Sequence, residues 1–391
     1  MGAELNGLRE QLLVHVREQG GAMDALVADA LRTVPRHIFL PDLPPDDAYR
    51  DEAIVTKRDE AGRPTSSSSQ PTIMAIMLDQ LGVARGQKVL EIGAGTGFNA
   101  ALIAHIVGPR GRVISIDLDP EIVGRAEENL SAAGGCERIT VLNADGVLGH
   151  PDRAPYDRII ATVGVWDLAP AWLEQLGPEG RIVVPLDLRG VQRSVAFERE
   201  GDHWASRSTR ACGFMRMRGS FAGPEREYLL DKDTQLTLGL PEAREIDRDA
   251  VLEALDAPEA EVRTGVSPDR LELFDGLALW LAVREPRWFS LSEAPPGTRL
   301  PNAPLVAPDA VLTAGILDDF GLATLSSDNG ELTVTGTERI AEELAEHVVA
   351  WDEAGRPGSA GLHIDAYPAG TPADGDFVID KKCVRLVLSW T

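Results

Sequence analysis

The segment EIGAGTG, Glu91 to Gly97, places an acidic residue before three glycines at alternate positions. It follows a short apolar run and precedes a run with helical spacing, so we expect a loop between a strand and a helix. Glycines there let the backbone approach a ligand, and the N–H groups of the helix N-terminus can bind it. A dinucleotide-binding loop needs a further glycine where this chain has Phe98, so that pattern fails. The residues of this segment expected to contact a ligand are Glu91, Gly93, Ala94, Gly95, Thr96 and Gly97.

Two more carboxylates follow predicted strands. Asp117 is the last residue but one of the run RVISIDL, twenty residues after Gly97, and Asp145 ends ITVLNAD. Either aspartate alone would more simply be a helix N-cap or a turn residue. Because the carboxyl ends of parallel strands meet at one edge of a sheet, three such ends in register favour a ligand site. The adjacent residues Leu118 and Gly146 are included in it.

The elements that must position these residues alternate along the chain. Strand-length apolar runs and helical runs alternate from Lys88 to Leu186, which predicts an α/β fold with a Rossmann-like, doubly wound sheet. Two antiparallel strands are predicted directly after it. Upstream, residues 3–33 predict two helices broken at Gly20-Gly21, and a helix is predicted over Pro71–Leu81 with proline in the permitted first turn.

Three parts are expected along the 391 residues. Residues 1–78 form N-terminal helices and a substrate-side segment, and residues 79–223 form the ligand-binding core. Residues 224–391 no longer alternate between strand and helix, yet they contain two long helix candidates and a final strand, KKCVRLVLSW. We interpret them as an α+β C-terminal domain that helps to bind the substrate.

Charge and composition exclude several function classes. The net charge of -24 opposes binding to phosphate backbones, so nucleic acid and anionic membranes are not expected partners. Neither a signal peptide nor an apolar run of membrane-spanning length is present in this sequence. Cys136, Cys212 and Cys383 lie far apart, which fits free thiols in the cytoplasm and, with few histidines, predicts no metal site.

Six motifs in order over residues 28 to 220 resemble the protein-L-isoaspartate O-methyltransferases. They are VPRHIFLP, AYRDEAI, SQP, VLEIGAGTG, DG with PYDRIIATVG, and QLGPEGRIVVPL. The glycine loop led by Glu91 is similar to motif I of the class I methyltransferases that use S-adenosyl-L-methionine. The resemblance implies that the loop holds the methionine part of this cofactor, Asp117 the ribose and Asp145 the adenine. It also implies methyl transfer to an aspartate-derived carboxylate of a peptide or protein.

The serine run SSSSQP lies where this family has Thr-Ile-Ser-Gln-Pro. The resemblance assigns the active-site role to Ser69, with Gln70 beside the cofactor. Ser67 replaces the threonine and Ser68 replaces the isoleucine, so we expect all three hydroxyls to orient the acceptor carboxylate and Ser66 to line the substrate pocket. A disordered serine linker is the alternative, but a linker does not explain the matching neighbours on both sides.

A second departure from the family follows the fourth predicted strand, in GVWDLAPAW. Trp166 and Asp167 are candidates for the wall of the acceptor pocket. The alternative is a core tryptophan with an aspartate that caps the next helix, and the sequence does not separate the two.

The chemistry itself needs few side chains, because a carboxylate with a pKa of about 4 is already ionised and requires no general base. Two interpretations of the function share this methyl-transfer chemistry. In one, the enzyme tailors an aspartate of a constrained, macrocyclic ribosomal peptide, of the lanthipeptide or graspetide kind, through a methyl ester that collapses to a succinimide (aspartimide). In the other, it repairs isoaspartyl residues in ageing proteins. The serine run and the C-terminal domain favour tailoring. A tRNA methyltransferase conflicts with the charge of -24, and a non-catalytic binding module conflicts with the intact loop.

Overall fold

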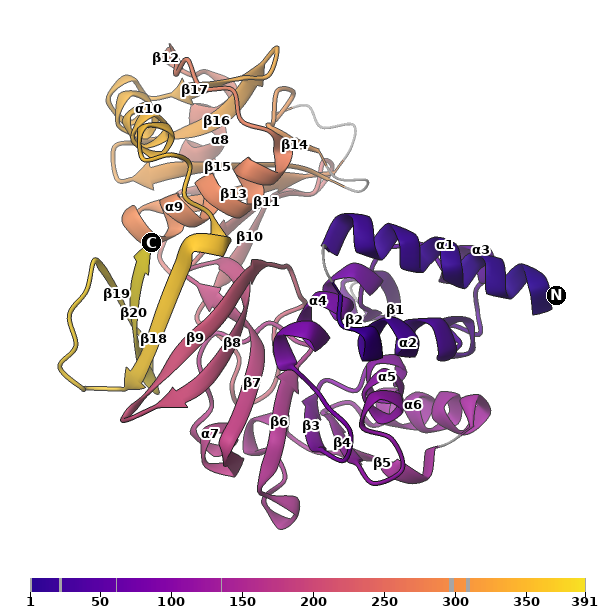
Figure 1. The fold of residues 1–391 in the computed structure, drawn as a ribbon. Coiled ribbons are helices and arrows are strands. Elements are labelled where there is room, and N and C mark those ends of the chain that lie inside the picture. The colour runs from indigo at the N-terminus through magenta and orange to yellow at the C-terminus, as the bar shows by residue number, and fades with distance from the viewer. Residues whose placement is uncertain are drawn as a thin grey trace.

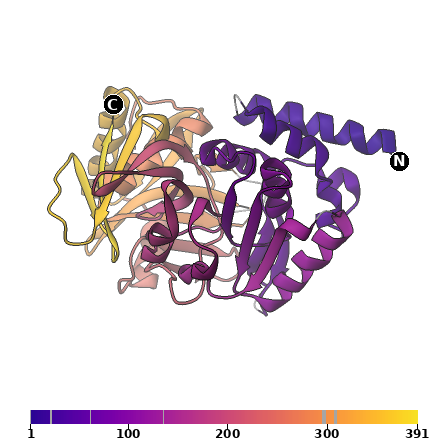
Figure 2. The same ribbon diagram turned by 60° about the horizontal axis from the view of Figure 1, so that its bottom comes forward.

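The computed structural model describes residues 2–20, 23–60, 62–134, 136–294, 299–306 and 310–390. Strands in these ranges form a large sheet, a second sheet built by the C-terminal region and a short two-stranded ribbon. In both views the N-terminal helices lie at the opposite end of the molecule from the last strands (Figures 1 and 2).

The large sheet confirms the predicted Rossmann-like core. Strands β5, β4, β3, β6 and β7 pair in parallel, and β8 and β9 extend the sheet in antiparallel fashion. In spatial order the ten strands are β19 (Phe377–Asp380), β20 (Val384–Trp390), β18 (Leu362–Pro368), β9 (His203–Ala211), β8 (Val191–Glu200), β7 (Leu176–Leu188), β6 (Tyr156–Ala161), β3 (Lys88–Ile92), β4 (Arg112–Asp117) and β5 (Ile139–Asn143).

Helices cover both faces of this sheet. One apolar cluster joins the N-terminal helices, α4 and α5 to the sheet, and another buries Trp172 of α7 on the other face. The predicted helix over Pro71–Leu81 is confirmed as α4, which ends at the left-handed residue Gly82. The helices of this part are α1 (Gly2–Gly20), α2 (Ala25–Thr33), η1 (Arg36–Phe39), α3 (Pro45–Ala48), α4 (Pro71–Leu81), α5 (Phe98–Val107), α6 (Pro120–Ala133), η2 (Cys136–Arg138), η3 (Gly146–Leu148), η4 (Pro151–Arg153) and α7 (Pro170–Gln175).

The serine run is part of a paired strand and is not a disordered linker. Ser66 to Ser68 belong to strand β2 (Pro64–Ser68), which pairs antiparallel with β1 (Ile54–Arg58) in the two-stranded ribbon. The break expected at Gly20-Gly21 falls at the end of α1, and Gly21 itself lies outside the described residues. The expected boundary after residue 78 falls inside α4, so the first two predicted parts share one core.

The C-terminal region builds its own antiparallel sheet, on which α10 packs. The strand order is β10 (Arg226–Asp231), β11 (Leu236–Leu240), β13 (Trp288–Glu293), β15 (Val311–Asp318), β16 (Gly321–Asp328), β17 (Glu331–Gly336) and β12 (Ala260–Arg263), with β14 (Leu305–Val306) beside β15. Its helices are α8 (Arg248–Asp256), the π-helical turn η5 (Glu272–Leu277), α9 (Ala278–Arg284), α10 (Glu338–Glu353) and η6 (Ser359–Gly361).

The last strands correct the expectation that residues 224–391 form one separate domain. Strand β18 pairs with β9 of the large sheet, through Asp365 with Ala205 and Ala366 with Trp204, and β20 and β19 continue the sheet outward. In Figure 1 these yellow strands lie beside β9, away from α10. The sequence pattern identified the strand at 384–390 but could not indicate which sheet it joins, because pairing across 160 residues leaves no local signal.

Within the described ranges, the helices lack the combination of length and apolar character needed to cross a bilayer.

Glu91 lies beneath the glycine loop and has no exposed surface. Its carboxylate accepts hydrogen bonds from Asn99 Nδ2 at 2.7 Å and from Ser115 Oγ at 2.5 Å. Burial raises the pKa of Glu91 to about 7, the two hydrogen bonds oppose that shift, and the nearby charge of Asp117 adds to it. The residue therefore links the first turn of α5 to β4 and supports the loop from below.

We predict that Glu91→Gln changes the pH dependence of stability. In the wild type the folded protein keeps the Glu91 proton up to about pH 7, whereas the unfolded chain releases it near pH 4.5. The free energy of unfolding should therefore fall between these two pH values, by on the order of 3 kcal/mol relative to the variant. Urea titrations at pH 4.5, 6 and 7.5 measure this, with exposed Glu127→Gln as the control. Parallel curves for wild type and Glu91→Gln would contradict the assignment.

Candidate active site

A cavity of about 460 Å³ opens at the carboxyl ends of the parallel strands, beside β2. This is the switch point of a doubly wound sheet, where ligands of such folds bind. The cavity collects most of the residues that the sequence predicted for the site. Those that line it are Ser66, Ser67, Ser68, Ser69, Gln70, Gly93, Ala94, Gly95, Thr96, Asp117, Leu118, Asp145 and Gly146.

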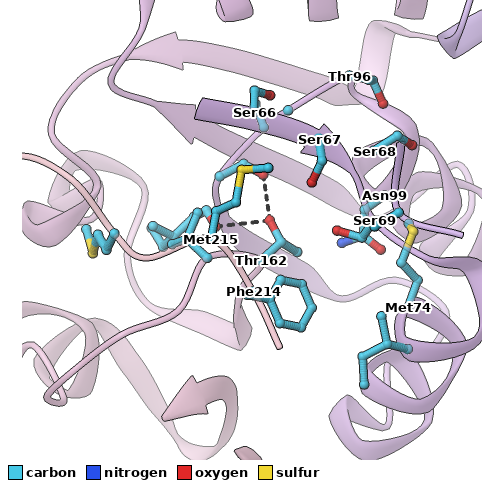
Figure 3. Close-up of a pocket in the computed structure, with 18 of the residues that line it drawn as sticks. Ser66, Ser67, Ser68, Ser69, Met74, Thr96, Asn99, Thr162, Phe214 and Met215 are labelled. Carbon is cyan, nitrogen blue, oxygen red and sulfur yellow. Dashed lines mark hydrogen bonds between the residues drawn. The ribbon is translucent and has the colours of Figure 1, made fainter. Parts of the chain in front are cut away.

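The glycine loop connects β3 to α5 as predicted. Gly93 has φ of +100°, and a Cβ atom there would lie 2.8 Å from Thr162 Oγ1, so only glycine fits. Thr162 in turn donates a hydrogen bond to the Gly93 carbonyl at 2.7 Å (Figure 3). Gly97 differs from the prediction, since it does not line the cavity: a Cβ there would meet Leu130 at 3.1 Å, so this glycine serves the packing of α5 on α6.

The two strand-end aspartates both line the cavity. The Asp117 carboxylate accepts from the backbone N–H of Gly95 at 3.3 Å and of Asp119 at 3.1 Å, and burial raises its pKa. The Asp145 carboxylate accepts from Val147 N at 3.2 Å and from Ser220 Oγ at 2.7 Å. Asp145 therefore also forms the local turn that was the alternative to a ligand contact. Its bond to Ser220 in addition holds the segment after β9 beside the cavity.

The serine strand forms the opposite wall. The Ser66 hydroxyl accepts a hydrogen bond from Thr56 Oγ1 at 3.2 Å, within the ribbon. In Figure 3 the Ser67 side chain points toward Thr162, whereas Ser66 points away from it. The hydroxyls of Ser67, Ser68 and Ser69 have no hydrogen-bond partner among the described residues, and that of Ser68 is fully buried. An unpartnered buried hydroxyl is costly, so its place in a cavity wall points to a ligand that accepts from it.

Two charged residues that the sequence left without a role hold this wall in place. Arg36, with no exposed surface, donates to the Ala48 carbonyl at 2.9 Å and to the Ser69 carbonyl at 3.1 Å. Asp51 accepts from Gln70 Nε2 at 2.9 Å and from the Thr72 backbone N–H at 2.8 Å. The turn after β2 is thus fixed from both sides.

The residues present fit S-adenosyl-L-methionine. The backbone of Gly93, Ala94 and Gly95 lines the cavity, and Asp117 offers a carboxylate to a ribose diol. Asn99 adds a buried Oδ1 atom without a partner among the described residues, an acceptor suited to an ammonium group. This asparagine lies two residues after the glycine loop and was not predicted, although its polar side chain in the first turn of a largely apolar helix was a usable signal.

The predicted pocket residues Trp166 and Asp167 do not line the cavity. Asp167 is fully buried and accepts from the backbone N–H of Cys383 at 2.6 Å and of Leu168 at 2.8 Å. Trp166 packs against Phe221 with ring centroids 5.7 Å apart. Asp167 in the segment GVWDLAPAW therefore binds the segment before strand β20 to the core. The alternative, an aspartate that caps the next helix, is also not observed, because the residue before α7 is Ala169, which has no side-chain cap. Glu91 likewise supports the loop from below without reaching the cavity.

Several cavity residues were missed by sequence reasoning. They come from the segment after β9 and from the C-terminal region: Cys212, Phe214, Met215, Arg218 and Phe274. No local pattern marks them, because the fold alone brings them to the site.

Comparison with known proteins agrees with this geometry. The sequence pattern of the family described as Protein-L-isoaspartate(D-aspartate) O-methyltransferase (PCMT) matches residues 7–220. Over 220 residues the chain is 37% identical to a protein-L-isoaspartate O-methyltransferase of Methanopyrus kandleri, covering 56% of this chain and 95% of that one. It is 36% identical over 221 residues to protein-L-isoaspartate O-methyltransferase 2 of Archaeoglobus fulgidus, covering 56% and 97%.

A solved structure of a protein-L-isoaspartate O-methyltransferase aligns with 98% of this chain and 99% of its own, with a TM-score of 0.54 and 21% identity. That likeness shows the fold, and it extends through the C-terminal region. The family pattern spans more than half of the chain and includes the glycine loop, Asp117 and the serine turn. The chain therefore belongs to the protein-L-isoaspartate O-methyltransferase family, and it is a carboxyl O-methyltransferase that uses S-adenosyl-L-methionine.

Proposed function

We propose that this enzyme methylates the free carboxylate of isoaspartyl residues in peptides and proteins. The observation that carries the proposal is the set of serines Ser67 to Ser69, which line the cavity beside the glycine loop and Asp117 and whose hydroxyls have no hydrogen-bond partner among the described residues. Hydroxyls can donate to a carboxylate without adding a charge that would quench its nucleophilicity.

The residues of the chain supply orientation. When bound, S-adenosyl-L-methionine provides a methyl group on a positively charged sulfur, which is readily transferred. Glycines of the loop and Asp117 would hold it, and the serine hydroxyls would aim the acceptor carboxylate at it. Such alignment of two bound reactants can contribute on the order of 7 to 11 kcal/mol. Phe214 and Met215, which line the same cavity, keep this space apolar and exclude water (Figure 3).

Repair of isoaspartyl linkages is supported better than tailoring of a ribosomal peptide. The relatives that the chain matches are protein-L-isoaspartate O-methyltransferases. From the sequence, the C-terminal region favoured tailoring. It also aligns with a solved structure of a protein-L-isoaspartate O-methyltransferase, so its presence no longer distinguishes tailoring from repair. What still favours tailoring is the replacement of an apolar residue by Ser68, which adds a buried hydroxyl to the pocket.

The substrate class is tested with labelled S-adenosyl-L-methionine and three peptides of one sequence. They carry isoaspartate in a linear chain, aspartate in a linear chain and aspartate in a macrocycle. The transferred methyl group is measured as labelled methanol released from the ester by base. We expect the rate of methyl transfer to the isoaspartyl peptide to be at least about a hundredfold higher than to the linear aspartyl peptide, since the pocket must reject the ordinary linkage. Label on the macrocycle alone would overturn the repair proposal in favour of tailoring.

Ser69→Ala is expected to lower kcat by about tenfold to a hundredfold, the loss of one hydrogen bond to a charged acceptor, with cofactor affinity unchanged. Ser66→Ala is the matched control, because its hydroxyl already has a partner in the ribbon. Steady-state kinetics and calorimetric titration separate the two effects. Loss of cofactor affinity in Ser69→Ala would instead assign this serine to the cofactor site.

Asp117→Ala is expected to weaken binding of S-adenosyl-L-methionine by about 1.5 to 3 kcal/mol, through loss of charge-assisted hydrogen bonds from the ribose. Asp157→Ala serves as the control, because this carboxylate lies at the opposite, amino-terminal ends of the parallel strands, where it accepts from Lys88 N at 2.7 Å. Isothermal titration calorimetry measures both variants. Equal affinity in the two would place the ribose elsewhere.

A further inference from the structure

The C-terminal region contributes one side chain to the active-site cavity. Phe274 lies in η5, and it lines the same cavity as the serine strand and the glycine loop. Its ring is 42% exposed, whereas Leu273 and Leu277 of the same turn are buried in the core of the C-terminal region. A half-exposed aromatic ring at the wall of a cavity is suited to contact a ligand.

The backbone of Phe274 is held firmly from the large sheet. Arg193 of β8 has no exposed surface, and its Nη2 donates to the carbonyls of Phe274 at 3.1 Å and Asp275 at 2.8 Å. Burial lowers the pKa of Arg193 to about 10, so it remains charged at neutral pH. The Asp275 carboxylate accepts from the backbone N–H of Ser359 at 3.1 Å, which fixes the turn from its other side. A π-helical turn held in this way is common at functional sites.

Phe274 lies at the end of the cavity away from the cofactor strands. Arg193 is opposite Ala211 in the register of β8 and β9. Strand β8, which carries Arg193, is four strand spacings from β4, which carries Asp117, or on the order of 19 Å. The ring therefore belongs to the side of the cavity that receives the acceptor and not to the nucleotide side.

Two further apolar side chains line that end. Ile76 projects from α4, which contacts β7 and β8. Phe214 is fixed at its backbone by the Gln192 side chain, which accepts from Phe214 N at 2.7 Å and donates to Phe214 O at 3.1 Å. We propose that Phe274, Phe214 and Ile76 form a specificity pocket for an apolar or aromatic side chain flanking the acceptor residue of the substrate. This inference rests on the proposed function and names a substrate preference of the same site.

The test uses the full-length enzyme and a set of isoaspartyl peptides. The residue on each side of the isoaspartate is varied in turn among Leu, Phe, Ser and Gly. Wild-type kcat/KM should be roughly tenfold higher with Leu or Phe than with Ser at one of the two positions. Phe274→Ala should reduce that ratio to below about threefold, and Phe274→Leu should retain most of it, because an apolar wall remains.

Leu271→Ala is the matched control, since Leu271 is 67% exposed beside the same turn but does not line the cavity. It should keep the wild-type preference, and all variants should bind S-adenosyl-L-methionine equally. Methylation without any preference in the wild type, or an unchanged preference in Phe274→Ala, would overturn the pocket while leaving the proposed function intact. If no isoaspartyl peptide is methylated although the cofactor binds, the proposed function fails and the pocket fails with it.

Discussion

The active site depends on one buried cation. The Arg36 guanidinium has no exposed surface and joins three separate segments: the Ala48 carbonyl, the Ser69 carbonyl and the ring of Phe98, 5.1 Å from its central carbon. Removing such a group from water costs several kcal/mol, and its partners must offset that cost. The bonds are satisfied only when the N-terminal segment, the serine turn and the start of α5 lie together. The same side chain therefore positions the serine turn at Ser69 and the start of α5, which follows the glycine loop.

The rest of the site follows a common electrostatic logic. Asp117 lines the cavity and is bound to backbone N–H groups, Glu91 is buried beneath the loop, and the serine side chains of the cavity wall are neutral hydroxyls. A positively charged methyl donor is favoured by the carboxylates of Asp117 and Asp145, while the serine hydroxyls can donate to the acceptor carboxylate without neutralising it. This arrangement explains how a reaction between two charged groups proceeds without an acid or a base.

The core of this site was predictable from sequence, because its signals are local. Gly93 and Asp117 each lie at the carboxyl end of a strand whose pattern is visible in the residues themselves, and Ser69 was identified by its place in the SQP motif that resembles the family. The bounds of α4, β3 and β4 were predicted for the same reason. Phe274 and Arg193 were not predictable, since they meet through pairing between distant segments. Asp167 was wrongly placed in the pocket because a carboxylate after a strand has the same local pattern whether it meets a ligand or, as here, the backbone of Cys383.

The path of the chain through the large sheet has a consequence for how the enzyme forms in the cell. The chain leaves this sheet after β9, builds a second sheet, and returns at β18 to cover the edge that β9 would otherwise expose. During synthesis the methyltransferase core can begin to fold once about residue 211 has emerged, yet its edge strand β9 stays open until β18 has been made. For that interval the nascent chain carries an unpaired strand edge that can pair with other chains. Strands β18, β20 and β19 thus complete the catalytic sheet, and truncations that remove them act on that sheet itself.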